Sequence, residues 1–155
     1  MLLSEIFTVD RIKVDLASKT KTELFHELVS FLEESGAISD ANRVMDALWQ
    51  RESVMSTLVA PNIALPHASL WLFKQTVGAF GVSKQGIDYG APDGKPVHLV
   101  MLLIDDRYES DKHLAILKKS ARLVGSPNFL SKILSCNQPQ DVFDLIIQME
   151  EMQRI

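Results

Sequence analysis

The stretch from Val97 to Ile104 constrains the fold more than any other part of the sequence. Its side chains are apolar except for that of His98. A strand that is apolar at successive positions buries both of its faces, whereas a half-exposed strand alternates apolar with polar residues. We therefore expect this stretch to be a central strand of a sheet.

Other segments carry the patterns of further strands and of helices. Alternating or continuous apolar residues predict strands at residues 12–16, 62–65 and 76–82. Helical periodicity and capping residues predict helices at residues 21–35, 40–51 and 110–124, and two more that start near Pro127 and Pro139. Strands that interleave with helices indicate an α/β domain.

Length and composition favour one globular domain over residues 1–155. The chain is 46% hydrophobic and 23% charged, and it contains no internal repeat and no linker-like tract. Its formal net charge of -4, without a clustered Lys/Arg stripe, argues against a nucleic-acid partner. No apolar run reaches the roughly 18 residues that span a bilayer, and the first residues do not resemble a signal peptide. We expect a cytoplasmic protein that does not insert into membranes.

A Pro-His pair at Pro66 and His67 is the first candidate for chemistry. Proline fixes its own φ and restricts the preceding residue, so His67 is expected at a rigid strand end. A neutral imidazole is a good nucleophile near pH 7 and can carry a covalent group between two partners. By itself, however, a single histidine in a loop is more often structural.

Three further features accompany this pair: Arg51-Glu52, Ser56-Thr57 and His113-Leu114. Together with Pro66-His67, in this order and at these separations, they resemble the motifs of the mannitol/fructose family of phosphotransferase system enzyme IIA domains. The resemblance extends over nearly the whole chain. It implies a mixed β-sheet flanked by helices in a single domain.

The resemblance also implies roles for individual residues. His67 corresponds to the histidine that accepts the phosphoryl group, His113 to the second active-site histidine, and Arg51 to the cation near the phosphoryl group. The hydroxyl of Thr57 is a candidate phosphoryl contact, although it can equally satisfy local backbone groups in a turn.

The implied reaction is acceptance of a phosphoryl group from phospho-HPr, or from a paralogue of HPr, and its donation to an enzyme IIB component for sugar uptake. This reaction needs no cofactor and no metal. Asp105 and Asp106 are carboxylates at a strand end, but no third metal ligand is spaced to join them, and we interpret them as part of a solvated loop. His26 and His98 are interpreted as structural.

Some positions depart from the family pattern. Leu58, Ala60 and Asn62 stand where the fructose and nitrogen-regulatory branches usually have glycines, and Asn62 tolerates a left-handed backbone better than most residues. The segment 60–67 is closer to the ascorbate and galactitol branch. Ser69 stands where many relatives have an arginine, which removes one cation from the rim of the site.

These departures leave the sugar undetermined and two other functions open. The chain can be a regulatory module of the nitrogen-regulatory type, in which phosphorylation of His67 controls partner binding. It can also be a degenerate domain that has lost phosphoryl transfer, although the presence of His67 and His113 argues against this interpretation.

Overall fold

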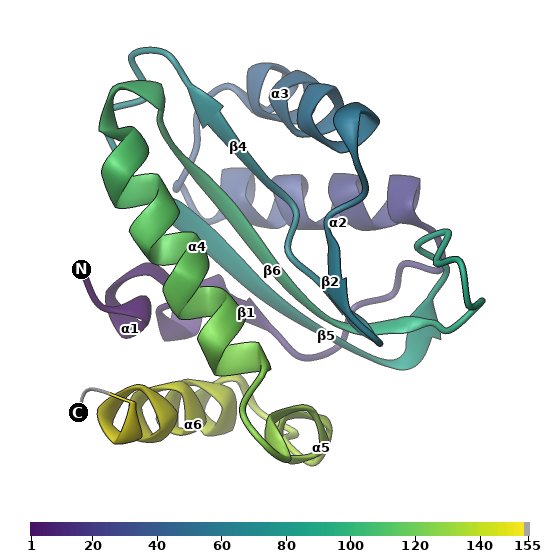
Figure 1. Cartoon of the computed structure of the whole chain (residues 1–155). Helices are drawn as coiled ribbons and strands as arrows, with labels where there is room; N and C mark the ends of the chain where they lie inside the picture. The colour runs from purple at the N-terminus through teal and green to yellow at the C-terminus, as the bar shows by residue number, and fades with distance from the viewer. Residues whose placement is uncertain (154–155) are drawn as a thin grey trace.

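The computed structural model describes residues 1–153, which form a six-stranded mixed sheet with helices on both faces (Figure 1). The strands are β1 (Ile12–Lys13), β2 (Leu58–Ala60), β3 (Ile63–Ala64), β4 (His67–Leu70), β5 (Val77–Ile87) and β6 (Val97–Asp106). The α-helices are α1 (Leu3–Ile6), α2 (Lys21–Glu34), α3 (Ala41–Val54), α4 (Ser110–Val124), α5 (Phe129–Leu134) and α6 (Pro139–Met152). Two short 3₁₀ helices are η1 (Val9–Arg11) and η2 (Arg107–Glu109). The α/β architecture predicted from the sequence is confirmed.

Strand β6 lies in the middle of the sheet, as its apolar sequence predicts. It pairs antiparallel with β5 on one side and parallel with β3 and β4 on the other. Leu99, Met101 and Leu103 enter the core under α1, α4, α5 and α6, whereas the alternating residues Val100 and Leu102 enter the core under α2 and α3. The two layers of helices are visible on opposite faces in Figure 1. Both faces of β6 are therefore buried.

Strands β3 and β4 are two parts of one path along β6, interrupted at Leu65 and Pro66. Ala64 pairs with Val100 and His67 with Leu103, which is the same register on both sides of the interruption. Proline has no N–H for the ladder, but the carbonyl of Pro66 still accepts a 3.0 Å hydrogen bond from the Leu103 amide. The interruption therefore does not shift His67 relative to β6.

Helix positions agree better with the sequence than strand boundaries do. Helix α4 has the predicted limits, and the side chains of Thr20 and Asp40 cap α2 and α3 as expected. Strand β1 is shorter than predicted, β5 continues to Ile87, and β2 and β4 were not predicted. Helix α5 begins at Phe129 rather than near Pro127.

The β2–β3 turn has Asn62, and not a glycine, at its left-handed position. Asn62 has a φ of 71°, in the left-handed region, and its side-chain amide donates a 2.8 Å hydrogen bond to the carbonyl of Pro96. The short polar side chain makes this conformation accessible. The turn thus forms without glycine.

Within residues 1–153, no helix has both the length and the apolar character needed to cross a lipid bilayer.

Gly78 in β5 is required by the packing of α1 on the sheet. A Cβ atom at this position would lie 2.5 Å from Cε1 of Phe7 and 2.7 Å from Cγ2 of Ile6. We predict that Gly78→Ala lowers the free energy of unfolding by about 1–3 kcal/mol, because the Phe7 ring must move out of its place. Urea unfolding measures this change. Combining it with Phe7→Leu should recover part of the loss, and strictly additive losses would contradict a local clash.

Candidate functional site

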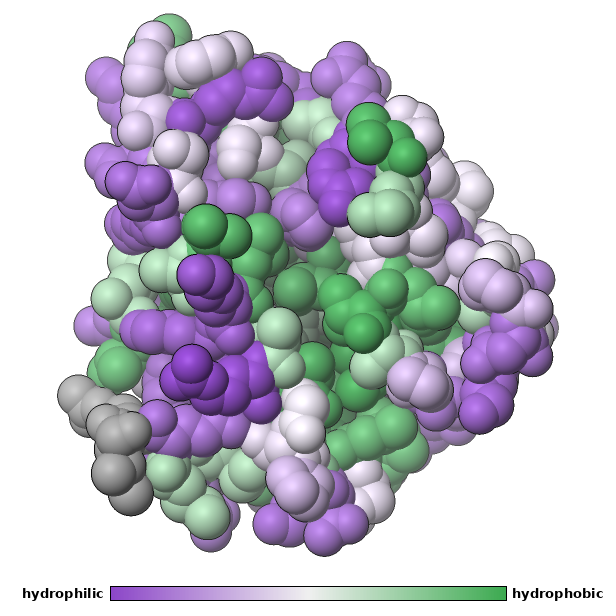
Figure 2. Space-filling view, in the orientation of Figure 1, coloured by the Kyte–Doolittle hydropathy of each residue, from purple (hydrophilic) through white to green (hydrophobic). Residues whose placement is uncertain are grey.

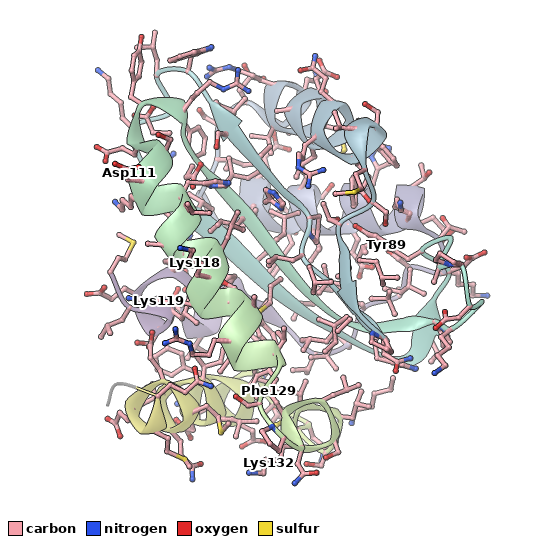
Figure 3. All side chains as sticks on the ribbon, viewed as in Figure 1. Tyr89, Asp111, Lys118, Lys119, Phe129 and Lys132 are labelled. Atoms are coloured by element: carbon pink, nitrogen blue, oxygen red, sulfur yellow. The ribbon has the colours of Figure 1, made fainter. Side chains whose placement is uncertain are left out.

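A basic pocket of about 590 Å³ lies where β4 and β6 end and α4 begins. Asp111 in the first turn of α4, labelled in Figure 3, marks this end of the helix. The pocket lining includes three arginines and two histidines, namely Arg43, Arg51, Arg107, His67 and His113. Among the residues that the structure describes, no carboxylate lines it. A chain with a net charge of -4 thus presents a cationic pocket suited to an anion.

His67 is the first residue of β4 and is partly buried at the pocket surface. Its Nδ1 atom lies 2.8 Å from the carbonyl oxygen of Leu65. A carbonyl oxygen accepts and cannot donate, so Nδ1 carries the proton and Nε2 keeps its lone pair. The backbone therefore selects the tautomer in which Nε2 is the nucleophilic atom.

Burial lowers the pKa of His67 below its ordinary value, and the positive charge of Arg51 and the nearby His113 lower it further. The hydrogen bond to Leu65 and the carboxylate of Asp105 act in the opposite direction but do not outweigh these effects. The lowered pKa keeps the ring neutral around pH 7. A neutral ring is the form that can attack phosphorus.

His113 lies in the first turns of α4, with its ring centre 5.5 Å from that of His67. Its Nδ1 atom donates a hydrogen bond to Oδ2 of Asp105. The hydroxyl of Ser69 donates to the other carboxylate oxygen, Oδ1, over 2.7 Å. Asp105 is only 2% exposed.

The interpretation of Asp105 and Asp106 as a solvated loop is wrong. Both residues belong to β6 and are buried, and Asp106 accepts hydrogen bonds from the amides of Lys74 and Tyr108. The missed sequence signal was their position, directly after the apolar run 97–104 and shortly before the helix that carries His113. Carboxylates at such a place have partners from two neighbouring segments.

Arg51 lies in the last turn of α3, and one of its guanidinium nitrogens donates a 2.8 Å hydrogen bond to the carbonyl of Met55. Arg43 and Arg107 also line the pocket, although the sequence did not single them out. The Arg107 guanidinium lies 5.4 Å from the centre of the Trp71 ring. These two arginines add positive charge to the pocket.

The structure does not bring Thr57 into the pocket. Thr57 is 3% exposed, and its hydroxyl is 2.7 Å from both Oε2 of Glu52 and the hydroxyl of Tyr89. Tyr89, labelled in Figure 3, belongs to the core under α2 and α3. The Thr57 hydroxyl is thus already hydrogen-bonded to Glu52 and Tyr89. We therefore leave Thr57 out of the proposed site.

Glu52 is the centre of this buried network. Burial alone would raise the pKa of its carboxyl group, but hydrogen bonds from Thr57 and Lys21 outweigh burial and lower the pKa. The Nζ atom of Lys21 lies 2.9 Å from Oε1 of Glu52. Since Arg51 precedes Glu52, the network also fixes the helix turn that presents Arg51.

His26 and His98 do not line the pocket. His26 is exposed on α2, and Nδ1 of His98 lies 2.7 Å from the carbonyl oxygen of Ser83.

Residues 5–149 match the model of the family described as "Phosphoenolpyruvate-dependent sugar phosphotransferase system, EIIA 2". The chain belongs to this EIIA family. It is 30% identical over 151 residues to the fructose-specific EIIABC component of Bacillus subtilis, covering 97% of this chain but only 24% of that protein. It is 28% identical over 149 residues to the fructose-specific EIIA component of Haloferax volcanii, covering 96% of this chain and 97% of that protein.

A solved structure with the same fold is that of the nitrogen regulatory protein IIA-Ntr from Neisseria meningitidis. The TM-score is 0.84 at 28% sequence identity, and the match covers 93% of this EIIA chain and 98% of that one. The similarity therefore extends to both transport-named and regulatory-named members of the family.

The charge of Arg51 can be detected at His67 without any assay of function. We predict that Arg51→Ala raises the pKa of His67, because a positive charge that disfavours the imidazolium is removed. Titration of the histidine signals by NMR measures this shift, with His98 as an internal reference. Arg43→Ala is the matched control, since Arg43 is not among the groups that shift His67. An unchanged His67 midpoint in Arg51→Ala would place Arg51 outside the site.

Proposed function

We propose that this EIIA domain, formed by residues 1–155, accepts a phosphoryl group on Nε2 of His67 from the phosphohistidine of HPr or a paralogue, and passes it to an enzyme IIB component for sugar uptake. The proposal rests on the hydrogen bond from Nδ1 of His67 to the Leu65 carbonyl. This bond leaves Nε2 unprotonated and able to act as a nucleophile in a cationic pocket.

The transfer is balanced without a cofactor. The lone pair of His67 Nε2 forms a bond to phosphorus while the P–N bond of the donor breaks, and the electron pair of that bond returns to the donor ring. The proton on Nδ1 of His67 stays bound to Nδ1 and hydrogen-bonded to the Leu65 carbonyl throughout the transfer. In the second transfer the same bond at Nε2 breaks as the IIB nucleophile attacks.

The pocket offers what this reaction requires of a protein. A transferring phosphoryl group carries negative charge on its equatorial oxygens, so catalysis consists mainly of positioning and of cations and donors aimed at those oxygens. Arg51 supplies a planar set of N–H donors. His113, with its ring beside that of His67, supplies a further donor.

The surroundings of the pocket suit transient protein partners. Trp71 and Tyr108 are exposed and contact each other edge to face, with ring centres 4.7 Å apart, and Val54 and Leu114 are also exposed. Figure 2 shows apolar residues gathered between α4 and β2 on one face of the molecule, with hydrophilic residues around them. Exposed apolar residues around a charged centre are typical of docking surfaces.

The name of the Bacillus subtilis relative joins EIIA with B and C parts in one protein, and this supports an enzyme IIB as the acceptor. The phosphoryl group derives from phosphoenolpyruvate, which is made inside cells, so we propose a cytoplasmic site of action. The likeness to IIA-Ntr favours a second candidate, a regulatory module whose phosphorylation state controls partner binding. Transfer from phospho-His67 to an IIB domain distinguishes the two functions.

The proposal is tested by incubating the chain with enzyme I, a cognate HPr and phosphoenolpyruvate, followed by intact-protein mass spectrometry in neutral buffer. We expect one added phosphoryl group on the wild type and none on His67→Ala. The bond should be acid-labile and alkali-stable, as a phosphoramidate is. His98→Ala is the control and should be phosphorylated like the wild type.

If the wild type stays unmodified while another EIIA in the same tube is phosphorylated, the domain is degenerate. Phosphorylation of His67→Ala would mean that a different residue is the acceptor.

A further inference from the structure

We propose that Asp105, held in place by Ser69, is the positioning residue of His113: it fixes the ring so that Nε2 is directed at the phosphoryl group and supplies the negative charge that lets the ring hold two protons. This inference rests on the proposed function, because it assigns a role within the same transfer reaction.

The backbone brings Ser69 and Asp105 together. They are direct partners in the parallel ladder between β4 and β6. Their side chains therefore leave the sheet on the same face, and the Ser69 hydroxyl reaches Oδ1 of Asp105 over 2.7 Å. Nδ1 of His113 donates to Oδ2, so each oxygen of the Asp105 carboxylate accepts a hydrogen bond from a different residue.

The charge balance of Asp105 points to His113. Asp105 is 2% exposed, and a buried carboxylate requires a cation or several donors. Within residues 1–153, His113 is its one basic partner within ion-pair distance. In contrast to Glu52, which has Lys21, Asp105 relies on a group whose charge can change.

The hydrogen bond to Asp105 determines how His113 can assist transfer. Because Nδ1 already donates to the carboxylate, a neutral His113 has a lone pair on Nε2, and this lone pair would repel a phosphoryl oxygen. Donation to that oxygen requires a proton on Nε2 as well, which makes the ring an imidazolium. The Asp105 carboxylate lies beside that cation through its hydrogen bond with Nδ1.

Ser69 has a distinct part in this arrangement. Its hydroxyl donates to Oδ1 and restrains the orientation of the carboxylate. The positive charge at the rim comes from Arg43 and Arg107.

The tautomer of His113 provides a first test, read from the ¹⁵N shifts of the histidine side chains in the unphosphorylated protein. We expect the proton on Nδ1 of His113 in the wild type, and a shift of the proton toward Nε2 in Asp105→Asn, since the amide NH₂ can donate to Nδ1. Asp106→Asn is the matched control, because Asp106 binds the Lys74 and Tyr108 amides and should leave His113 unchanged. His98 serves as the internal reference in every spectrum.

Transfer kinetics with phospho-HPr provide the second test. Asp105→Asn should reduce kcat about 10–100-fold, the range typical of removing a carboxylate that orients a histidine from outside the reacting atoms, and leave KM nearly unchanged. The neutral ring of this variant can donate from Nε2, but it lacks the positive charge of the imidazolium that stabilises the phosphoryl oxygens. Ser69→Ala should have a smaller effect in the same direction. In a His113→Ala background, Asp105→Asn should cause no further loss, because Asp105 acts through His113.

Three results would overturn the inference. The first is that His113 in Asp105→Asn keeps the tautomer of the wild type, and the second is that Asp105→Asn leaves kcat unchanged. The third is that the losses of kcat from Asp105→Asn and His113→Ala multiply when the two substitutions are combined. If Asp105→Asn does not fold, Ser69→Ala must still lower kcat without raising KM, and wild-type kinetics there would reject the arrangement. The tautomer experiment needs no phosphoryl donor, so its outcome is independent of whether the proposed function is correct.

Discussion

The hydrogen bond between Nδ1 of His67 and the carbonyl of Leu65 is the interaction on which the site depends. It exists because Pro66 interrupts the strand that runs along β6 without changing its register. The amide of Leu65 in turn donates a 2.9 Å hydrogen bond to the carbonyl of Thr57. Leu65 therefore connects the imidazole to the segment that follows α3.

That connection explains why a buried polar network lies so close to the pocket without lining it. Glu52 binds both the amide and the hydroxyl of Thr57, and Lys21 neutralises the carboxylate. The network holds the end of α3, which presents Arg51, and the backbone that orients Leu65. Thr57 thus lies behind the pocket, whereas the sequence had left open whether its hydroxyl contacts the phosphoryl group or satisfies local groups.

Sequence patterns predicted the parts of the fold that follow from local chemistry. The apolar run of β6 fixed its central position, and side-chain caps such as Thr20 defined helix starts. Strand β4 was missed because HASL has too little apolar character to stand out, and its pairing with β6 is a tertiary effect. The resemblance of the short motifs to the EIIA family also indicated His67, Arg51 and His113, and all three line the pocket.

The rest of the site depends on contacts that no short motif contains. Asp105 meets His113 and Ser69 only because β4 pairs with β6 and α4 starts beside their ends. Arg43 and Arg107 come from α3 and η2, and each is an ordinary surface arginine in its own segment. Side chains of this kind acquire a function through the fold that gathers them.

The most direct test of this account is to identify which ring nitrogen of His67 carries the phosphoryl group. ¹⁵N and ³¹P NMR of the phosphorylated, ¹⁵N-histidine-labelled protein distinguishes the two nitrogens through the ³¹P–¹⁵N coupling. The account predicts coupling to Nε2, with the Nδ1 proton still present and hydrogen-bonded to Leu65. Phosphorylation at Nδ1 would contradict it, because the Leu65 carbonyl would then not determine the nucleophilic atom.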